Sequence, residues 1–169
     1  MNTLFTKTGS VVPPRPNTND EVVKRTVINQ AMDDLFAERG RGFKENDKAK
    51  LMESLMKHWE EGIDIYDLAR EFEDDGWGVN FDFVNKLENV SGCVDAALRA
   101  NIDDWAHEYD IALPYPIGTQ LDVGIITGVW GYWPATYKVL SKNEPEDSAT
   151  RLLIKFEDAK LANKEASHA

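Results

Sequence analysis

Apolar residues recur every three or four positions through the first two-thirds of the chain, which is the spacing of one buried face of a helix. The pattern predicts five helices, which begin at Asn19 or Asp20, after Asn46, at Asp64, near Phe81 and at Ser91. The first runs to about Arg39 and stops at the glycines 40 and 42, the second ends at Gly62, and the third ends before Gly76. The fourth is short, and the fifth turns Val94, Leu98, Ile102, Trp105 and Tyr109 inward.

The pattern changes near residue 110. Prolines 114 and 116 make residues 113–118 a linker, because helices rarely continue through such a stretch. Beyond it lie short segments rich in β-branched and aromatic residues, separated by glycine, proline and polar residues. They predict strands over residues 120–123, 125–130, 135–140 and 149–156. Four such strands are too few for a sandwich and fit a small, strongly bent barrel.

The order of signals in this C-terminal third resembles SH3-like small barrels of the Tudor and KOW kind. Gly118 opens a strand, residues 124–129 form a Gly-Ile-Ile-Thr-Gly-Val segment, and an aromatic loop follows. Thr136-Tyr-Lys-Val139 and Leu153-Ile-Lys-Phe-Glu-Asp158 complete the likeness. The resemblance implies an SH3-like barrel over residues 117–160. It implies nothing about the helical part.

The resulting prediction is an α+β protein in four parts. Residues 1–19 are an extended proline-rich arm, 20–110 an acidic helical domain, 117–160 the barrel and 161–169 a tail. Three prolines between residues 13 and 16 remove backbone donors and fix φ, which favours extended structure in the arm. Two interpretations of it stay open: a flexible tail, or an arm that orders against a partner through Leu4, Phe5 and Val11.

The charge balance of the chain argues against one class of partner. The chain has 19 bases and 30 acids, for a net charge of −11, and residues 20–109 hold 22 of the acids and 11 of the bases. This balance argues against binding to nucleic acid phosphates. We predict instead a protein partner with a basic surface, which docks on the densest acidic runs; the alternative is an ordinary solvated face. The predicted contact residues are Asp33, Asp34, Glu73, Asp74, Asp75, Asp103 and Asp104.

A second candidate surface is aromatic. Trp130, Tyr132 and Trp133 lie in one loop, and Tyr137 follows in the next predicted strand. Such rings can stack a base or enclose a cationic side chain. Local charge is near neutral, which favours a peptide or a Lys or Arg side chain. The alternative is that the rings close the barrel or seal it onto the helices.

The histidines and the cysteine, which could carry catalysis or bind a metal, do not occur in a recognisable catalytic or metal-binding motif. The histidines 58, 107 and 168 lack metal-ligand spacing, and Cys93 has no histidine near it in sequence. Residues 65–72 and 81–87 have the apolar rhythm of a helix-turn-helix, but the second helix and the turn are acidic, which disfavours DNA. We therefore predict no catalytic residue, no metal and no cofactor.

These observations together predict a cytoplasmic protein. No apolar run reaches the length of a membrane span, and the first residues do not resemble a signal peptide. Small, acidic, two-part proteins are similar in type to phage or mobile-element accessory factors that inhibit or remodel a host assembly, including host defence. A non-enzymatic interaction protein of that type is the first hypothesis. A structural subunit of a phage particle, supported by the proline arm, and an enzyme with an unrecognised site are the alternatives.

Overall fold

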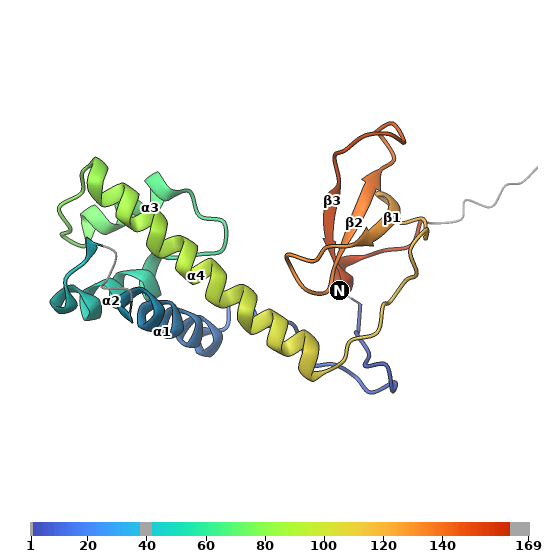
Figure 1. Ribbon diagram of the computed structural model, residues 1–169, viewed down its shortest axis with the longest axis horizontal. Coiled ribbons are helices and arrows are strands. Elements are labelled where there is room, and N and C mark those ends of the chain that lie inside the picture. Colours follow the sequence, from blue (N-terminus) through green and yellow to red (C-terminus); the bar gives the residue numbers. More distant parts are fainter. Residues whose placement is uncertain (1, 38–41, 163–169) are drawn as a thin grey trace, which may run out of the picture. The chain divides into compact units, whose positions relative to one another are not determined.

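The computed structural model describes residues 2–37 and 42–162. In these residues the protein is α+β, with four α-helices and one three-stranded antiparallel sheet (Figure 1). The chain forms two compact units, Pro16–Asn101 and the combination of Met1–Arg15 with Ile102–Ala169. We call the first the helical unit and the second the sheet unit, and describe each by itself.

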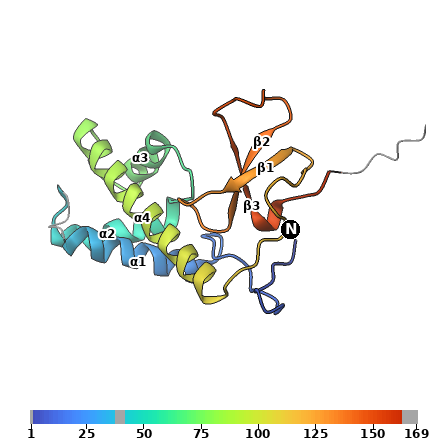
Figure 2. The same ribbon diagram turned by 45° about the vertical axis from the view of Figure 1, so that its right-hand side comes forward.

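The helical unit is built on amphipathic helices: α1 (Glu21–Ala37), α2 (Lys48–His58), α3 (Ile65–Asp74) and the first part of α4 (Phe81–Glu108). Helix α1 packs against α2, and α2 packs against α3 (Figure 2). The predicted apolar stripes form the core, whose largest fully buried side chains include Ile28, Leu35, Leu51, Trp59 and Phe72. Burial of each such side chain stabilises the folded state by roughly 1.5–3 kcal/mol.

Two of the predicted helix starts are fixed by side-chain caps. The Asp64 carboxylate accepts hydrogen bonds from the backbone N–H groups of Tyr66 and Asp67 at the start of α3. Asp20 accepts from those of Val22 and Val23 at the start of α1. Each cap satisfies donors that the first turn leaves unpaired. Helix α1 is described to Ala37, and its predicted stop at residues 40–42 lies mostly outside the described residues.

The predicted fourth and fifth helices are one continuous helix, α4, so the prediction of five helices was wrong by one. Ser91 does not cap a new helix, because its hydroxyl accepts a hydrogen bond from Trp59 Nε1 at 3.1 Å. The buried face runs straight through this point, from Leu87 through Val90 to Val94. Gly92 is tolerated within the helix, where it costs about 1 kcal/mol relative to alanine.

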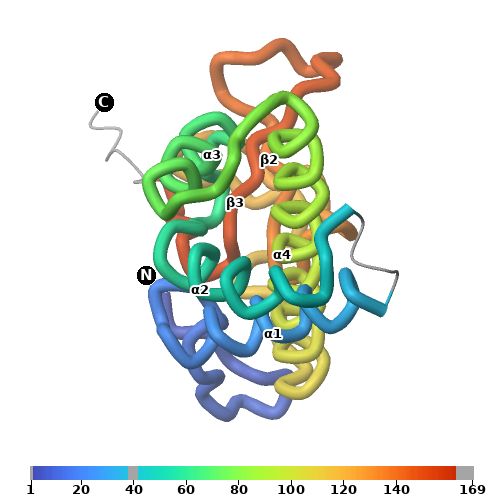
Figure 3. Tube along the Cα trace, turned by 90° about the vertical axis from the view of Figure 1, so that its left-hand side faces the viewer, coloured from blue at the N-terminus to red at the C-terminus, as the bar shows by residue number. Residues whose placement is uncertain are grey.

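The sheet unit contains β1 (Gly124–Val129), β2 (Thr136–Ser141) and β3 (Leu152–Lys155), with β2 in the middle. The β1–β2 register shifts between Ile126 and Gly128. Predicted strand 120–123 is instead a turn, because Leu121 and Gly124 bond to each other's carbonyls and isolated bridges join residues 120 and 121 to Ile125 and Leu161. The described strands do not close into a barrel. The long β2–β3 loop extends beyond the sheet (Figure 3).

The proline-rich N-terminal segment packs within the sheet unit through residue 15. Leu4 and Val12 are buried, and an isolated bridge pairs Phe5 with Val11. Arg15 lies 8% exposed and forms a two-pronged ion pair with Glu157, with Nε–Oε1 at 2.5 Å and Nη2–Oε2 at 3.1 Å. Its guanidinium also donates to the carbonyls of Pro134 and Ala135. This segment is therefore tied to the last elements of the chain.

Candidate interaction surfaces

The helical unit presents its acids to solvent. Its described part holds 18 aspartates and glutamates, of which 15 are exposed and the others, Asp47, Asp75 and Asp95, are half-buried. Carboxylates stay at the surface because removing a charge from water is costly unless it is paired. The unit therefore carries most of its negative charge on its surface, and little of it is buried.

Some of the predicted acidic contact residues form ion pairs within the protein, and others do not. Asp33 forms an ion pair with Lys48 at 3.0 Å, and Asp75 forms one with Lys57 at 2.6 Å. Among the described residues, no ion pair engages Asp34, Glu73 or Asp74. Glu73 and Asp74 thus lie next to each other, exposed and outside any ion pair in the described part of the chain. The nearby Lys50 ammonium donates instead to the carbonyl of Gly76 at 3.0 Å.

Two further predicted acids belong to the sheet unit. Asp103 and Asp104 are exposed on α4, and Asp103 lies 3.5 Å from His107 Nδ1. Both acids lie beyond Asn101, where the helical unit ends. They form a second, smaller acidic patch.

The position of Glu73 and Asp74 works against helix stability. Both lie in the last turn of α3, and that turn has no basic residue. The C-terminal end of a helix carries a partial negative charge, so each acid there is unfavourable by roughly 0.3–1 kcal/mol. Folding alone would favour lysine or arginine at these positions.

Asp75, the neighbour of these two acids, holds the α3 end against α2. Its carboxylate accepts a hydrogen bond from Ser54 Oγ at 2.8 Å and contacts His58 Nε2 at 3.0 Å. Hydrogen bonds from Lys57 and then Ser54 lower the pKa of Asp75 from 3.8 to about 2. Its role is accordingly structural. No local sequence pattern indicates this cluster, because Ser54 and His58 lie in a different helix.

The arrangement around Ser54 is not that of an activated nucleophile. Ser54 is 2% exposed, donates to Asp75 and accepts from Trp77 Nε1 at 3.0 Å. A serine nucleophile needs a base within hydrogen-bond reach, and here the nearby His58 contacts the carboxylates of Glu71 and Asp75 instead. These bonds fasten two helices together.

The aromatic residues of the sheet unit separate into surface and core. The rings of Trp130 and Tyr132 lie 5.6 Å apart, and Tyr132 is 57% exposed. Trp130 and Trp133 are half-buried. Tyr137 is fully buried: its hydroxyl accepts from the backbone N–H of Tyr115 and donates to its carbonyl, both at 2.8 Å, and burial raises its pKa. Tyr137 therefore belongs to the core of the unit and offers no ring to a partner.

Of the remaining histidines and the cysteine, which could carry catalysis or bind a metal, those that the structure describes do not lie in a cluster of reactive side chains. His107 is exposed and its ring contacts the carbonyl of Asp103, while Cys93 is half-buried. His168 lies outside the described residues. Over residues 2–37 and 42–162, no group of three or more histidine, cysteine or acidic side chains has the arrangement of a metal site. No helix in the same ranges has the length and apolar character to cross a bilayer.

Comparison of the chain with protein-family models, with curated proteins and with solved structures gave no match. Any functional assignment therefore depends on the geometry and charge of the two units themselves.

Proposed function

We propose that this chain is a non-enzymatic interaction protein that binds a protein partner with a basic surface through the acidic face of its helical unit. The observation that carries the proposal is the exposed pair Glu73 and Asp74 at the C-terminal end of α3. Neither acid forms an ion pair with a described residue, since the nearby Lys50 and Lys57 bind Gly76 and Asp75, and both acids oppose the helix dipole. Acids that weaken their own helix are explained by a partner that supplies the missing positive charge.

The rest of the surface supports fast electrostatic association. Fifteen exposed acids in one unit raise the local concentration of a basic partner, and such steering speeds association more than it strengthens the final complex. The exposed ring of Tyr132, beside Trp130, is a second contact that suits a Lys or Arg side chain. The non-enzymatic part of the proposal is supported by the hydrogen bonding of Ser54, which does not pair it with His58.

We extend the proposal, by type alone, to a phage or mobile-element accessory factor that inhibits or remodels a host assembly in the cytoplasm. Residues 117–160 keep the SH3-like interpretation as part of this proposal, supported by the bulged β1–β2 pair and the aromatic loop. The alternative of a particle subunit draws on the proline-rich segment. Leu4, Val12 and Arg15 of that segment are buried within the protein's own sheet unit, so we do not develop that alternative.

The experiment compares two double variants of equal charge. Glu73→Lys/Asp74→Lys changes the proposed contact, and Glu146→Lys/Asp147→Lys makes the same change in net charge on the exposed β2–β3 loop. Immobilised protein is exposed to a bacterial lysate, bound proteins are identified by mass spectrometry, and association rates are then measured with the purified partner. We expect the first variant to slow association several-fold and the second to retain it.

Both variants must remain folded for the comparison to hold. We expect the first to melt at the same or a higher temperature, because lysine suits the end of α3 better than an acid. The proposal is wrong if both variants bind the partner equally. It is also wrong if affinity stays constant between about 50 and 500 mM salt, a range over which the Debye length falls from roughly 14 to 4 Å.

A further inference from the structure

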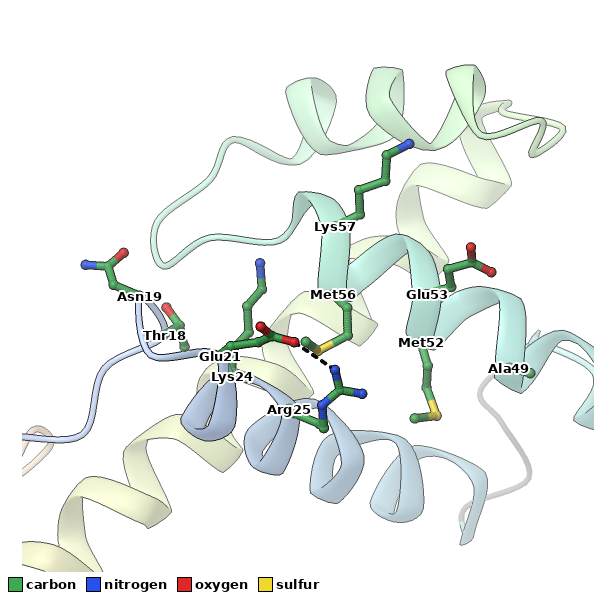
Figure 4. A pocket seen from close by; sticks show the side chains of 10 residues that line it. All are labelled: Thr18, Asn19, Glu21, Lys24, Arg25, Ala49, Met52, Glu53, Met56 and Lys57. Carbon is green, nitrogen blue, oxygen red and sulfur yellow. Dashed lines mark hydrogen bonds and ion pairs between the residues drawn. The ribbon is translucent and has the colours of Figure 1, made fainter.

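A groove of about 730 Å³ opens in the helical unit between the start of α1 and one side of α2 (Figure 4). Residues 18–25 form one wall, and residues 49–57 form the other. The volume lies within the range of small-molecule sites. None of the acidic contacts proposed above lines this groove, so the groove is a separate candidate site.

The α2 wall of the groove provides apolar surface. Met52 and Met56 lie one turn apart and are half-buried, and Ala49 extends the same side. Methionine side chains are flexible and polarizable, so they adapt to apolar ligands of different shape. This wall can therefore receive an apolar body rather than one fixed shape.

Three cationic side chains line the groove, Lys24 and Arg25 on the α1 wall and Lys57 on the α2 wall. Arg25 is paired with Glu21 at 2.9 Å, and Lys57 is paired with Asp75 at 2.6 Å. Lys24 differs from both, because no hydrogen bond or ion pair joins its ammonium to another described residue. Figure 4 shows its side chain extending into the space between the two helices.

Lys24 is also partly removed from water. It is half-buried, and this desolvation lowers its pKa, with Glu60 acting in the opposite direction. A cation that has lost part of its hydration, and that forms no hydrogen bond or ion pair with a described residue, favours an anion that can reach it. The acids on the rim, Glu21 and Glu53, disfavour a ligand with more than one negative charge.

We propose that this groove binds a small amphiphilic monocarboxylate, with its carboxylate at Lys24 and its apolar body against Met52 and Met56. The hydroxyl of Thr18, which lines the mouth, can donate to the same carboxylate. The ligand joins the two chemistries that the groove places side by side, a partly desolvated cation and a flexible apolar wall. This binding is independent of the basic partner proposed above.

The test uses octanoate as the probe and the methionine methyl groups as reporters. The full-length protein is labelled at its methionine methyl carbons, and NMR spectra are recorded during titration. We expect saturable shifts at Met52 and Met56, while Met32, which is fully buried in the same unit, stays unchanged as an internal reference. Octanol, which has the same chain length and no charge, should bind about tenfold more weakly, because a charge-assisted hydrogen bond is lost.

Variants assign the effect to Lys24. Lys24→Gln should weaken octanoate binding about tenfold and leave octanol binding unchanged, and Lys24→Arg should retain octanoate binding. Lys44→Gln removes a charge from an exposed position of the same unit and serves as the matched control. The Met32 signal and the helical far-UV spectrum report whether each variant is folded. Equal binding of octanoate and octanol, equal binding by Lys24→Gln and Lys44→Gln, or no saturable shift in the unsubstituted protein would overturn the proposal.

Discussion

At the scale of single residues, Gly124 begins β1 where the neighbouring strand leaves no room for a side chain. A Cβ atom added there would lie 2.0 Å from the carbonyl oxygen of Leu140. We expect Gly124→Ala to lower the free energy of unfolding by about 1–3 kcal/mol or more, because backbone rather than a flexible side chain must move. Gly128→Ala, in the same strand with no atom within 4 Å of the added Cβ, is the control. Equal urea midpoints for the two variants would contradict this account.

Asp75 makes the stability of the helical unit depend on acid. Its pKa is lowered from 3.8 to about 2 in the folded protein, so the ionised carboxylate stabilises the fold above about pH 4. This contribution is lost as the pH falls through the interval toward 2, where the folded protein takes up the proton. We expect Asp75→Asn to reduce the free energy of unfolding at pH 7 and to flatten its pH dependence between about 4 and 2.

Denaturant unfolding at a series of pH values measures this effect. Asp74→Asn is the control, because no ion pair engages Asp74 among the described residues. An unchanged slope in Asp75→Asn, or the same change in both variants, would show that the bonds from Lys57 and Ser54 do not stabilise the folded state.

The sequence located the aromatic and acidic clusters along the chain, but it did not show which of their side chains are exposed. Tyr137 and Tyr132 lie in the same aromatic stretch, yet the first is fully buried and the second is 57% exposed. The difference depends on Tyr115 and Phe156, which contact Tyr137 across distances that a local pattern does not register. Asp74 and Asp75 are adjacent, and only Asp75 reaches Ser54 on another helix. Contacts between elements that are distant in sequence therefore decide which of these residues are buried or structural and which are exposed.

At the scale of secondary-structure elements, the N-terminal segment is held by a buried ion pair. Removing only one partner of such a pair leaves a buried charge unpaired and costs about 3–5 kcal/mol. We expect Arg15→Met and Glu157→Leu each to destabilise the sheet unit by that amount, and the double variant to cost clearly less than their sum. Some cost should persist in the double variant, since Arg15 also donates to the carbonyls of Pro134 and Ala135.

Unfolding is monitored by tryptophan fluorescence in a background with Trp59→Phe and Trp77→Phe, which removes the tryptophans of the helical unit. The remaining signal includes Trp105, whose ring centroid lies 5.2 Å from the guanidinium carbon of Arg15. Additive losses in the double variant would mean that Arg15 and Glu157 act independently. In that case the segment would be held mainly by the burial of Leu4 and Val12.

The apolar periodicity predicted a helix or strand correctly where its boundaries depend on neighbouring residues. It was less successful where a contact with a distant residue determines the boundary. The capped start of the third helix at Asp64 follows from the sequence, because the cap and the helix are adjacent. The boundary predicted at Ser91 does not exist, because Trp59 takes the hydroxyl that would have capped a new helix. The predicted strand at residues 120–123 is a turn closed by hydrogen bonds between Leu121 and Gly124, and the bridge from Leu121 goes to Leu161, far along the chain. The proline-rich segment likewise carries no local sign of its contact with Glu157.

At the scale of the whole molecule, the net charge of −11 makes the fold self-repelling at low ionic strength. Raising sodium chloride from about 0.01 to 0.15 M shortens the Debye length from roughly 30 to 8 Å and screens this repulsion. We expect the melting temperature to rise over that range. Glu146→Lys/Asp147→Lys, whose net charge is −11 + 4 = −7, should show a smaller rise. A melting temperature that falls with salt would show that exposed ion pairs outweigh repulsion.

The pairing of Arg15 with Glu157, 142 residues apart in sequence, has a consequence for the order of events during synthesis. Residues 16–101 leave the ribosome as one continuous stretch and can fold early. Residues 1–15 emerge before them but must wait for almost the whole chain before their packing sites exist. Until then Leu4 and Val12, which are buried in the folded protein, are open to proteases and chaperones. A premature stop before residue 157 would therefore be sensed far away in sequence, at residues 1–15, as a segment that never becomes protected.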